Sequence, residues 1–254
     1  MTNSPITNIM IIHKYIKRGL NHANYCEDFI LHETLEDQYE LFGVFDGCSS
    51  GVDSHFASSF IAKTVKSEFY KLAVETDLPQ EDFMKKLLFG VIFTLKEQQK
   101  ILSLNRDELL STIILFLYDK NTDSGIIVTI GDGVISINGT HIIIDENNVP
   151  DYLAYHLDNI NDEAEFKIWY LMHTQQYFID NLIDISISTD GATSFVPTGK
   201  TIDRDELINP LDYLLKDMFL LKNKAMLGRK CNILERKHGL VNGDDLGVIR
   251  VLKL

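Results

Sequence analysis

The pattern of apolar and polar positions divides the chain into short strands and a few amphipathic helices. Residues 41–45 are apolar apart from Gly43, which is typical of a strand buried on both faces, and residues 182–189 alternate between apolar and polar. These patterns predict strands at 9–12, 29–32, 39–46, 109–118, 124–130, 134–137, 141–144, 166–173, 182–189 and 246–252. Several of them pair as hairpins across polar turns, of which Asn138-Gly139 is the strongest signal.

Apolar residues at helical spacing predict two helices in the first half of the chain, one over 52–74 and one that begins at Pro79. Two more are predicted over 203–221 and 222–238. Because hairpins dominate, the fold class is α+β, with largely antiparallel sheets and helices outside a two-sheet core. The chain shows no repeat or linker, so we expect residues 1–254 to form one domain, in which the acidic, irregular segment 145–166 is a candidate flap.

Acidic residues stand where several predicted strands begin or end. Asp46-Gly47 and Asp190-Gly191 each follow a strand, and Asp132 lies between two glycines after another strand. Glu27-Asp28 and Asp244-Asp245 each precede a strand. A buried carboxylate is costly unless a positive group meets it, and carboxylate oxygens suit magnesium or manganese. For any single Asp-Gly pair, a plain turn is the alternative explanation.

The net charge of the chain limits the classes of partner that it can bind. The chain has 24 basic and 37 acidic residues, a net charge of −13, which argues against non-specific binding of nucleic acid or of an anionic membrane. No apolar run approaches the length of a membrane span, and the N-terminus has no signal-peptide pattern. Cys26, Cys48 and Cys231 show no paired spacing, which indicates reduced thiols. We therefore expect a cytoplasmic protein, and a monomer.

Taken in order, these acidic motifs resemble those of the type 2C (PPM) metal-dependent protein phosphatases, and in particular a bacterial branch of that family. The resemblance spans nearly the whole chain, from Glu27-Asp28 through the Asp46-Gly47 turn to the Asp244 motif. It implies a four-layer αββα sandwich, in which two mainly antiparallel sheets are flanked by helix pairs. It also implies a phosphoprotein substrate and two manganese or magnesium ions, with a third site in some bacterial members.

The resemblance also implies roles for individual residues. Asp46 would bridge two metals, with the Gly47 carbonyl on one of them, while Asp190 and Asp244 complete the first metal. Glu27 would face the second. The full metal set is Glu27, Asp28, Asp46, Gly47, Asp132, Asp190 and Asp244. Within this set, Asp28 would lie in the outer shell of the second metal, and Asp132 would contact the third metal. A metal-bridging water would attack phosphorus in line, so no protein nucleophile is required.

The chain departs from the family pattern at three positions. Cys48 replaces the histidine that usually follows the first Asp-Gly, Ala23 replaces the phosphate-gripping arginine, and Ser194 replaces an acid of the third motif. His22, Arg18 or Lys17 are candidates to take the place of the arginine. We assign the catalytic roles to Asp46, Asp190, Asp244 and His22. The histidines His13, His32, His141, His156, His173 and His238 show no metal-ligand spacing and receive no role.

Two functions of different classes fit this pattern. The leading one is a metal-dependent phosphomonoester hydrolase acting on phosphoserine or phosphothreonine. The alternative is a pseudophosphatase, a regulatory binding module that has lost turnover together with the missing arginine and histidine. The retained acids favour the hydrolase, since a cluster of like charges is costly without metal. A two-metal nuclease is disfavoured by the charge of −13.

Overall fold

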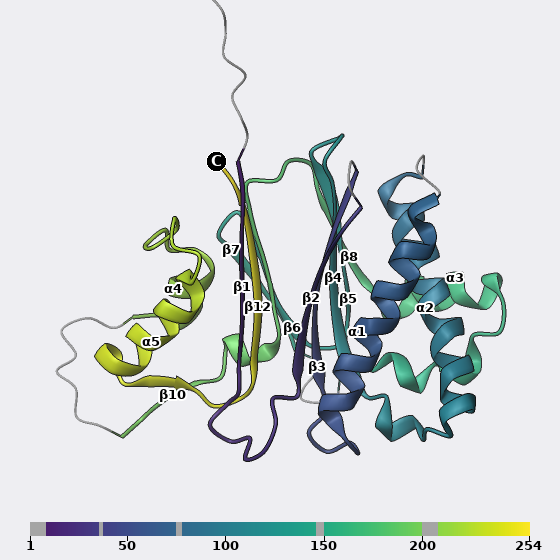
Figure 1. The fold of residues 1–254 in the computed structure, drawn as a ribbon, viewed down its shortest axis with the longest axis horizontal. Coiled ribbons are helices and arrows are strands. Elements are labelled where there is room, and N and C mark those ends of the chain that lie inside the picture. The colour runs from purple at the N-terminus through teal and green to yellow at the C-terminus, as the bar shows by residue number, and fades with distance from the viewer. Residues whose placement is uncertain (1–8, 36–37, 75–77, 146–149, 200–207) are drawn as a thin grey trace, which may run out of the picture.

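The computed structural model describes residues 9–35, 38–74, 78–145, 150–199 and 208–254, and shows four layers (Figure 1). Helices α1, α2 and α3 cover the outer face of one sheet, and α4 and α5 cover the outer face of the other. The helices are α1 (Ser54–Lys71), α2 (Gln80–Leu102), α3 (Glu163–His173), α4 (Pro210–Leu215) and α5 (Met226–His238). This is the expected αββα sandwich.

Both large sheets are antiparallel. One has the order β2-β3-β4-β5-β8 and the other β1-β12-β9-β6-β7, while β10 and β11 form a small separate ladder. The strands are β1 (Met10–Lys17), β2 (Asp28–Thr34), β3 (Tyr39–Gly47), β4 (Ser111–Asp119), β5 (Ser124–Ile130), β6 (Gly133–Ile137), β7 (Thr140–Ile144), β8 (Gln175–Ile179), β9 (Asp184–Ser188), β10 (Phe195–Pro197), β11 (Leu240–Asn242) and β12 (Leu246–Lys253). The predicted hairpins β2–β3, β4–β5 and β6–β7 are confirmed.

Strand β3 shows how the alternation of side chains builds the layers. Leu41 and Phe45 pack toward the helices α1 and α2, whereas Phe42 and Val44 pack into the layer between the two sheets. Since side chains alternate between the two faces, Asp46 belongs to the same face as Phe42 and Val44. The acid therefore lies at the end of the apolar layer between the sheets.

The prediction of a strand over 166–173 is wrong, because these residues belong to helix α3. The side chain of Asp162 caps the helix by accepting a hydrogen bond from the Glu165 amide at 2.8 Å. Phe166, Trp169 and Tyr170 are buried at helical spacing against α2 and its neighbours. Aromatic residues favour strands on average, but here the spacing and the cap decide for a helix.

The helix predicted over 203–221 is much shorter, because the described part of it contains only α4. Residues 203–207 lie outside the described residues. In and just after the last turn of α4, backbone carbonyls accept hydrogen bonds from buried cationic side chains as well as from helical amides. Arg250 donates to the carbonyls of Lys216 and Asp217, and Lys230 donates to those of Tyr213 and Asp217. These bonds end the helix and tie it to β12 and α5.

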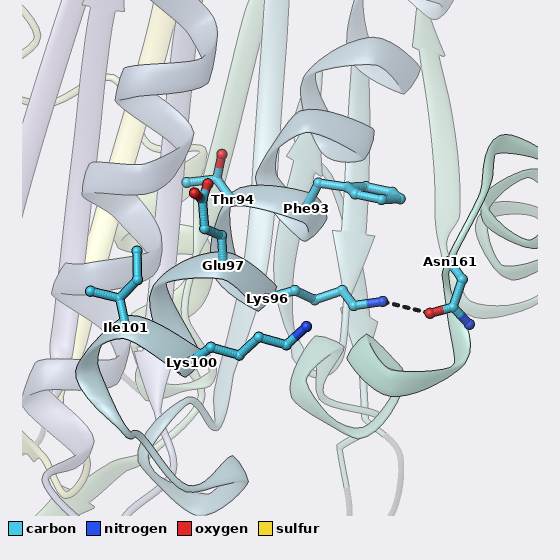
Figure 2. A pocket seen from close by; sticks show the side chains of 7 residues that line it. All are labelled: Phe93, Thr94, Lys96, Glu97, Lys100, Ile101 and Asn161. Atoms are coloured by element: carbon cyan, nitrogen blue, oxygen red, sulfur yellow. Dashed lines mark hydrogen bonds between the residues drawn. The ribbon is translucent and has the colours of Figure 1, made fainter.

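Part of the candidate flap, 145–166, is described, and residues 146–149 are not. Residues 150–162 form two short 3₁₀ turns, η3 (Leu153–Tyr155) and η4 (Leu157–Asn159), whose apolar side chains join the core beside α2. The segment is held to α2 by Lys96, whose amino group donates to the Ile160 carbonyl at 2.7 Å and to the Asn161 side chain at 2.9 Å (Figure 2). Movement of this segment stays a prediction.

Candidate metal centre

Acidic residues from five separate segments meet at one end of the layer between the sheets. Asp28 begins β2, Asp46 lies near the end of β3, and Asp132 stands between β5 and β6. Asp190 opens the short turn η5 (Asp190–Ala192) after β9, and Asp244 precedes β12. The strands run in alternating directions, so these acids arise both where strands begin and where they end.

The electrostatics show that the carboxylates are close neighbours. Burial raises the pKa of Asp46 well above its usual value, and the charges of Asp28, Asp190 and Asp244 raise it further. Burial, followed by the charges of Asp244 and Asp132, raises the pKa of Asp190 to about 6. Burial likewise raises the pKa of Asp28. The surroundings of each of these acids thus disfavour its ionised form, and a bound cation would offset this cost.

Three carboxylate oxygens in this cluster test whether the residues fit a metal. Asp28 Oδ1 and Asp190 Oδ1 are buried and accept no hydrogen bond from any residue that the structure describes, and the buried Glu27 Oε2 makes a long contact of 3.5 Å with His22 Nδ1. A buried charged oxygen without a partner is costly, and a divalent cation would meet that need. The donors are all hard oxygens, which suit manganese or magnesium. The residues therefore fit the metal that the sequence predicts.

Glycines allow the backbone to close around this cluster. The Gly47 amide donates to the Glu27 carbonyl at 3.1 Å, and a Cβ at this position would lie 2.1 Å from the Ser54 carbonyl oxygen. A Cβ on Gly191 would lie 1.7 Å from the carbonyl oxygen of Asp245. Neither position has room for a side chain, so the Asp-Gly pairs are required by packing as well as by chemistry.

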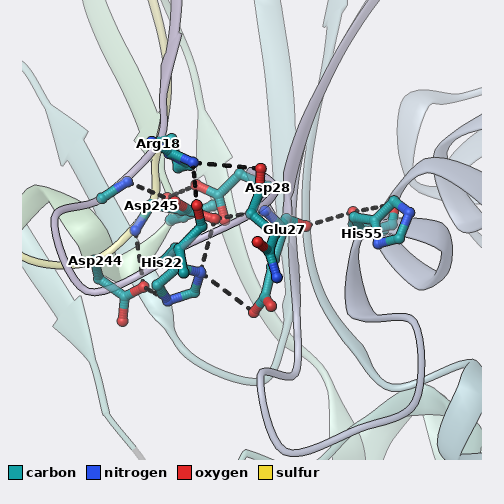
Figure 3. A network of polar contacts seen from close by, with 12 residues as sticks. Arg18, His22, Glu27, Asp28, His55, Asp244 and Asp245 are labelled. Atoms are coloured by element: carbon teal, nitrogen blue, oxygen red, sulfur yellow. Dashed lines mark hydrogen bonds and ion pairs between the residues drawn. The ribbon is translucent and has the colours of Figure 1, made fainter.

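The neighbouring acids Asp244 and Asp245 have different surroundings. The side chain of Asp244 is 45% exposed, and its carboxylate contacts His22 Nε2 at 2.9 Å (Figure 3). Asp245 is 1% exposed and accepts from the backbone amides of Gly19 at 2.6 Å and Glu27 at 2.5 Å. Asp245 therefore fixes the loop that carries Glu27. The sequence holds no signal that separates these two roles.

His22 lies among the acids. Its ring contacts Asp244 and also reaches Asp245 Oδ2 at 3.1 Å and Glu27 Oε2 at 3.5 Å (Figure 3). The other two candidates for the missing arginine are engaged elsewhere. Arg18 donates to the carbonyl oxygens of Ala23 and Asn24, and Lys17 pairs with Glu235 on α5. Of the three basic side chains, His22 is the one in the cluster.

The remaining two departures from the family pattern have clear local contacts. The Cys48 thiol lies 3.1 Å from the Ser50 hydroxyl. Burial would raise its pKa, but hydrogen bonds with Ser50 and Tyr152 lower it overall. The Ser194 hydroxyl accepts from the Asp244 amide at 3.0 Å and donates to the Gly191 carbonyl at 2.9 Å. Ser194 therefore joins the turn after β9 to the segment before β12.

A pocket of about 390 Å³ adjoins the carboxylates. His22, Tyr25, Glu27 and His55 line it, and the rings of Tyr25 and His55 stack with centroids 4.5 Å apart. A second cavity, of about 610 Å³, lies between α2 and Asn161 (Figure 2). Its lining includes Lys96 and Lys100 but none of the clustered acids, so we assign the chemistry to the first pocket.

Sequence comparison points to one family. The profile of a family described as Protein phosphatase 2C matches residues 18–222, which is most of the chain. A comparison with curated protein sequences gave no match. Among the described residues, none of the helices has both the length and the apolar character needed to cross a bilayer.

Solved structures with the same fold include several bacterial phosphatases. A serine/threonine phosphatase of S. agalactiae gives a TM-score of 0.59 at 15% identity, over 96% of this chain and 99% of that one. The catalytic domain of PstP, solved with two manganese ions, gives 0.59 at 14% identity, over 98% and 100%. The SpoIIE fragment from Bacillus subtilis gives 0.56 at 13% identity, over 97% of this chain, which spans only 64% of that fragment. At these identities the likeness shows the shared fold.

Proposed function

The chain belongs to the protein phosphatase 2C family, and from this premise we propose that it is a metal-dependent hydrolase of phosphoserine or phosphothreonine in proteins. The observation that carries the proposal is the cluster of buried and partly buried carboxylates, in which Asp28, Asp46 and Asp190 have raised pKa values and some oxygens have no hydrogen-bond partner. Such a cluster is costly without a cation, so its presence favours a working metal centre. PstP, which shares the fold, was solved with two manganese ions, and this supports the same metal here.

The acids would divide the metal binding among them. Asp46 would hold both ions and the Gly47 carbonyl would bind one of them. Asp190 and Asp244 would complete the first ion, and Glu27 would face the second. Asp28 would orient this set from behind, since it lies opposite Asp46 and accepts from the Thr189 hydroxyl at 2.7 Å. Asp132, whose charge acts on Asp190, would serve a third ion. Ions bound here would lower the pKa of a shared water and offset charge on the phosphoryl oxygens.

His22 is our candidate for the phosphate contact that Ala23 cannot make. It lines the pocket beside the acids, while Arg18 and Lys17 are engaged by other groups. Its ring contacts the carboxylates of Glu27 and Asp244, which places it beside the oxygens that would hold the ions. The net charge of −13 means that the local cations, and not the global field, must attract a phosphate.

A pseudophosphatase is the second candidate, and Cys48 and Ala23 favour it. Cys48 is a poor substitute for the histidine of the family pattern as a general acid, and Ala23 cannot grip phosphate as the arginine does. In that case the metal centre would persist as a structural element of a binding module.

Manganese titration of purified, chelator-treated protein separates the two candidates. Hydrolysis of an aryl phosphate and of a phosphothreonine peptide would be followed at each manganese concentration, with binding measured in parallel by calorimetry. We expect turnover to rise and saturate together with binding. Manganese binding without turnover would establish the pseudophosphatase, and absence of binding would remove the metal centre itself.

A further inference from the structure

A second group of side chains that could bind a metal lies in the segment 150–173, apart from the carboxylate cluster. Asp151 Oδ1 contacts His156 Nε2 at 2.6 Å, and Asp151 Oδ2 contacts His173 Nδ1 at 2.6 Å. The two imidazole rings lie with centroids 4.0 Å apart. Asp151 precedes η3, His156 lies between η3 and η4, and His173 ends α3. Three separate pieces of backbone thus meet at one carboxylate.

A simple hydrogen-bonded trio is the competing explanation. Burial would raise the pKa of Asp151, but hydrogen bonds with His156 and His173 and their charges lower it. The carboxylate is therefore ionised at neutral pH and attracts a cation. A metal ion satisfies all three groups at once, because imidazole binds metal in its neutral form.

The distances suit a small tetrahedral ion. One ligand atom from each residue can be chosen so that all lie within 4.8 Å of one another. Zinc with nitrogen and oxygen ligands at about 2.0–2.2 Å places neighbouring ligand atoms about 3.3 Å apart. The two contacts of Asp151 are shorter than that value, at 2.6 Å, so the three side chains would move slightly apart on binding an ion.

The ligand set also separates this group from the carboxylate cluster. Two imidazoles and one carboxylate favour zinc, cobalt or nickel over magnesium and manganese. The side chains of Asp151, His156 and His173 are 33%, 16% and 29% exposed, so water can reach a fourth position. Three protein ligands with an open position are a common zinc arrangement.

The backbone that carries the ligands is held in place. The His173 ring stacks on Trp169 at 14° between planes, with centroids 6.4 Å apart. Trp169 is buried in the core, and Lys96 fixes the end of the segment by donating to the Asn161 side chain (Figure 2) and to the Ile160 carbonyl. A site whose supporting residues are already packed loses less freedom when it binds an ion.

We propose that Asp151, His156 and His173 bind one zinc-class divalent ion, at a site separate from the carboxylate centre. The ion would hold the turns η3 and η4 against the end of α3. Tyr152 follows Asp151, is buried, and hydrogen-bonds the Cys48 thiol two residues beyond Asp46. The site would therefore stabilise the position of Tyr152, whose hydroxyl contacts Cys48. The proposal does not depend on phosphatase activity.

Cobalt titration tests the proposed site of Asp151, His156 and His173. Four-coordinate cobalt absorbs visible light strongly, whereas six-coordinate cobalt on oxygen ligands absorbs little. The protein would carry Asp46→Asn and Asp190→Asn, which disable the carboxylate centre. We expect a strong band that saturates at one equivalent and disappears when zinc is added. His156→Gln and His173→Gln should each weaken zinc binding at least about 10-fold.

Two controls make the result specific. His141→Gln removes a histidine that contacts a single aspartate, Asp212, at 3.1 Å, and should leave cobalt absorption unchanged. His22→Ala removes the histidine of the carboxylate cluster and should also leave it unchanged. Zinc should raise the melting temperature of the parent and of both controls, but not of His156→Gln or His173→Gln. The proposal is overturned if the band is absent, if His22→Ala abolishes it, or if both glutamine variants bind zinc as the parent does.

Discussion

Asp28 and Asp46 face each other directly across the β2–β3 ladder, one at the first residue of β2 and the other one residue before the end of β3. Like charges directly opposite each other destabilise a sheet. Here Asp28 is buried and Asp46 is partly buried, and desolvation together with the charge of Asp28 raises the pKa of Asp46. A packed sheet therefore contains a pair of neighbouring acids that repel each other when ionised, which supports the proposal that they bind a cation.

Replacing Asp46 tests the proposed centre most directly. Asp46→Asn keeps the shape of the side chain but removes the charge that would hold both ions. We expect manganese-dependent hydrolysis of an aryl phosphate to fall at least about 100-fold, since even outer-shell changes at metal sites cost 10- to 100-fold. The measurement is the initial rate at saturating manganese, with circular dichroism to show that the fold is intact.

Asp82→Asn is the matched control, because Asp82 is an exposed aspartate on α2 away from the carboxylates. Its rate should match that of the unmodified protein. An Asp46→Asn protein that keeps its full manganese-dependent rate would remove Asp46 from the metal centre.

Asp190→Asn should make the metal-free protein more stable. Asp190 is repelled by Asp244 and Asp132, and its pKa is raised to about 6, so its charge at neutral pH is unfavourable in the folded state. Removing that charge should raise the free energy of unfolding by about 1–3 kcal/mol in the absence of metal. With manganese the order should reverse, because the unmodified protein binds the ion more tightly.

Urea unfolding of both proteins, with chelator and with excess manganese, measures these four stabilities. The difference between the two conditions reports the metal alone, so a general effect of the substitution cancels. If Asp190→Asn is less stable than the unmodified protein under both conditions, Asp190 is a structural residue and not a strained ligand.

The order of elements and both sheets could be predicted from the sequence because apolar alternation is strong in the central strands. The structure of the segment 166–173 could not be predicted in this way. The aromatic residues Phe166, Trp169 and Tyr170 have a high propensity for strands, but their spacing is that of a helix. Strand β8 was missed next to it, as were β10 and β11, which are only three residues each. Such short strands are determined by their partners more than by their own residues.

The acids of the candidate site could be predicted because each stands beside a strand and next to glycine or another acid. Their partners could not. Asp245 and Asp244 are identical in sequence terms, and only the fold shows that Asp245 holds the amides of Gly19 and Glu27. The group around Asp151 was missed because His173 was expected on a strand. The spacing of Asp151, His156 and His173 becomes meaningful only when α3 returns beside η3.

Cys48→Ser should leave manganese affinity nearly unchanged. The thiol contacts Ser50 and Tyr152, and serine keeps a polar group of similar size at the same place. Since the expected ligands are oxygens of other residues, we predict a change in the dissociation constant of less than about threefold, which corresponds to about 0.6 kcal/mol. Calorimetry at fixed pH measures it. A tenfold or greater loss would identify the thiol as a ligand.

Glu40 provides a prediction on stability and pH that is independent of metal. Its side chain is buried and accepts from Thr34 at 2.8 Å, while His32 Nε2 lies at 2.6 Å and Lys120 Nζ at 3.1 Å. Burial would raise the pKa of Glu40, but hydrogen bonds from His32, Thr34 and Lys120 lower it overall, below the 4.5 of an ordinary glutamate. Because the pKa is lower in the folded state, the ionised carboxylate stabilises the fold above about pH 4.5, and this stabilisation is lost as the pH falls through the folded-state pKa.

Glu40→Gln should therefore lower the free energy of unfolding at pH 7 by about 1–3 kcal/mol, and the difference from the unmodified protein should shrink as the pH falls below about 4.5. Urea unfolding in chelator between pH 3.5 and pH 7 measures it. Glu235→Gln is the control, because Glu235 is 46% exposed and pairs only with Lys17 among the described ion pairs. It should stay within about 0.5 kcal/mol of the unmodified protein across the range. A Glu40→Gln difference that does not depend on pH would show that Glu40 acts through packing and not through its charge.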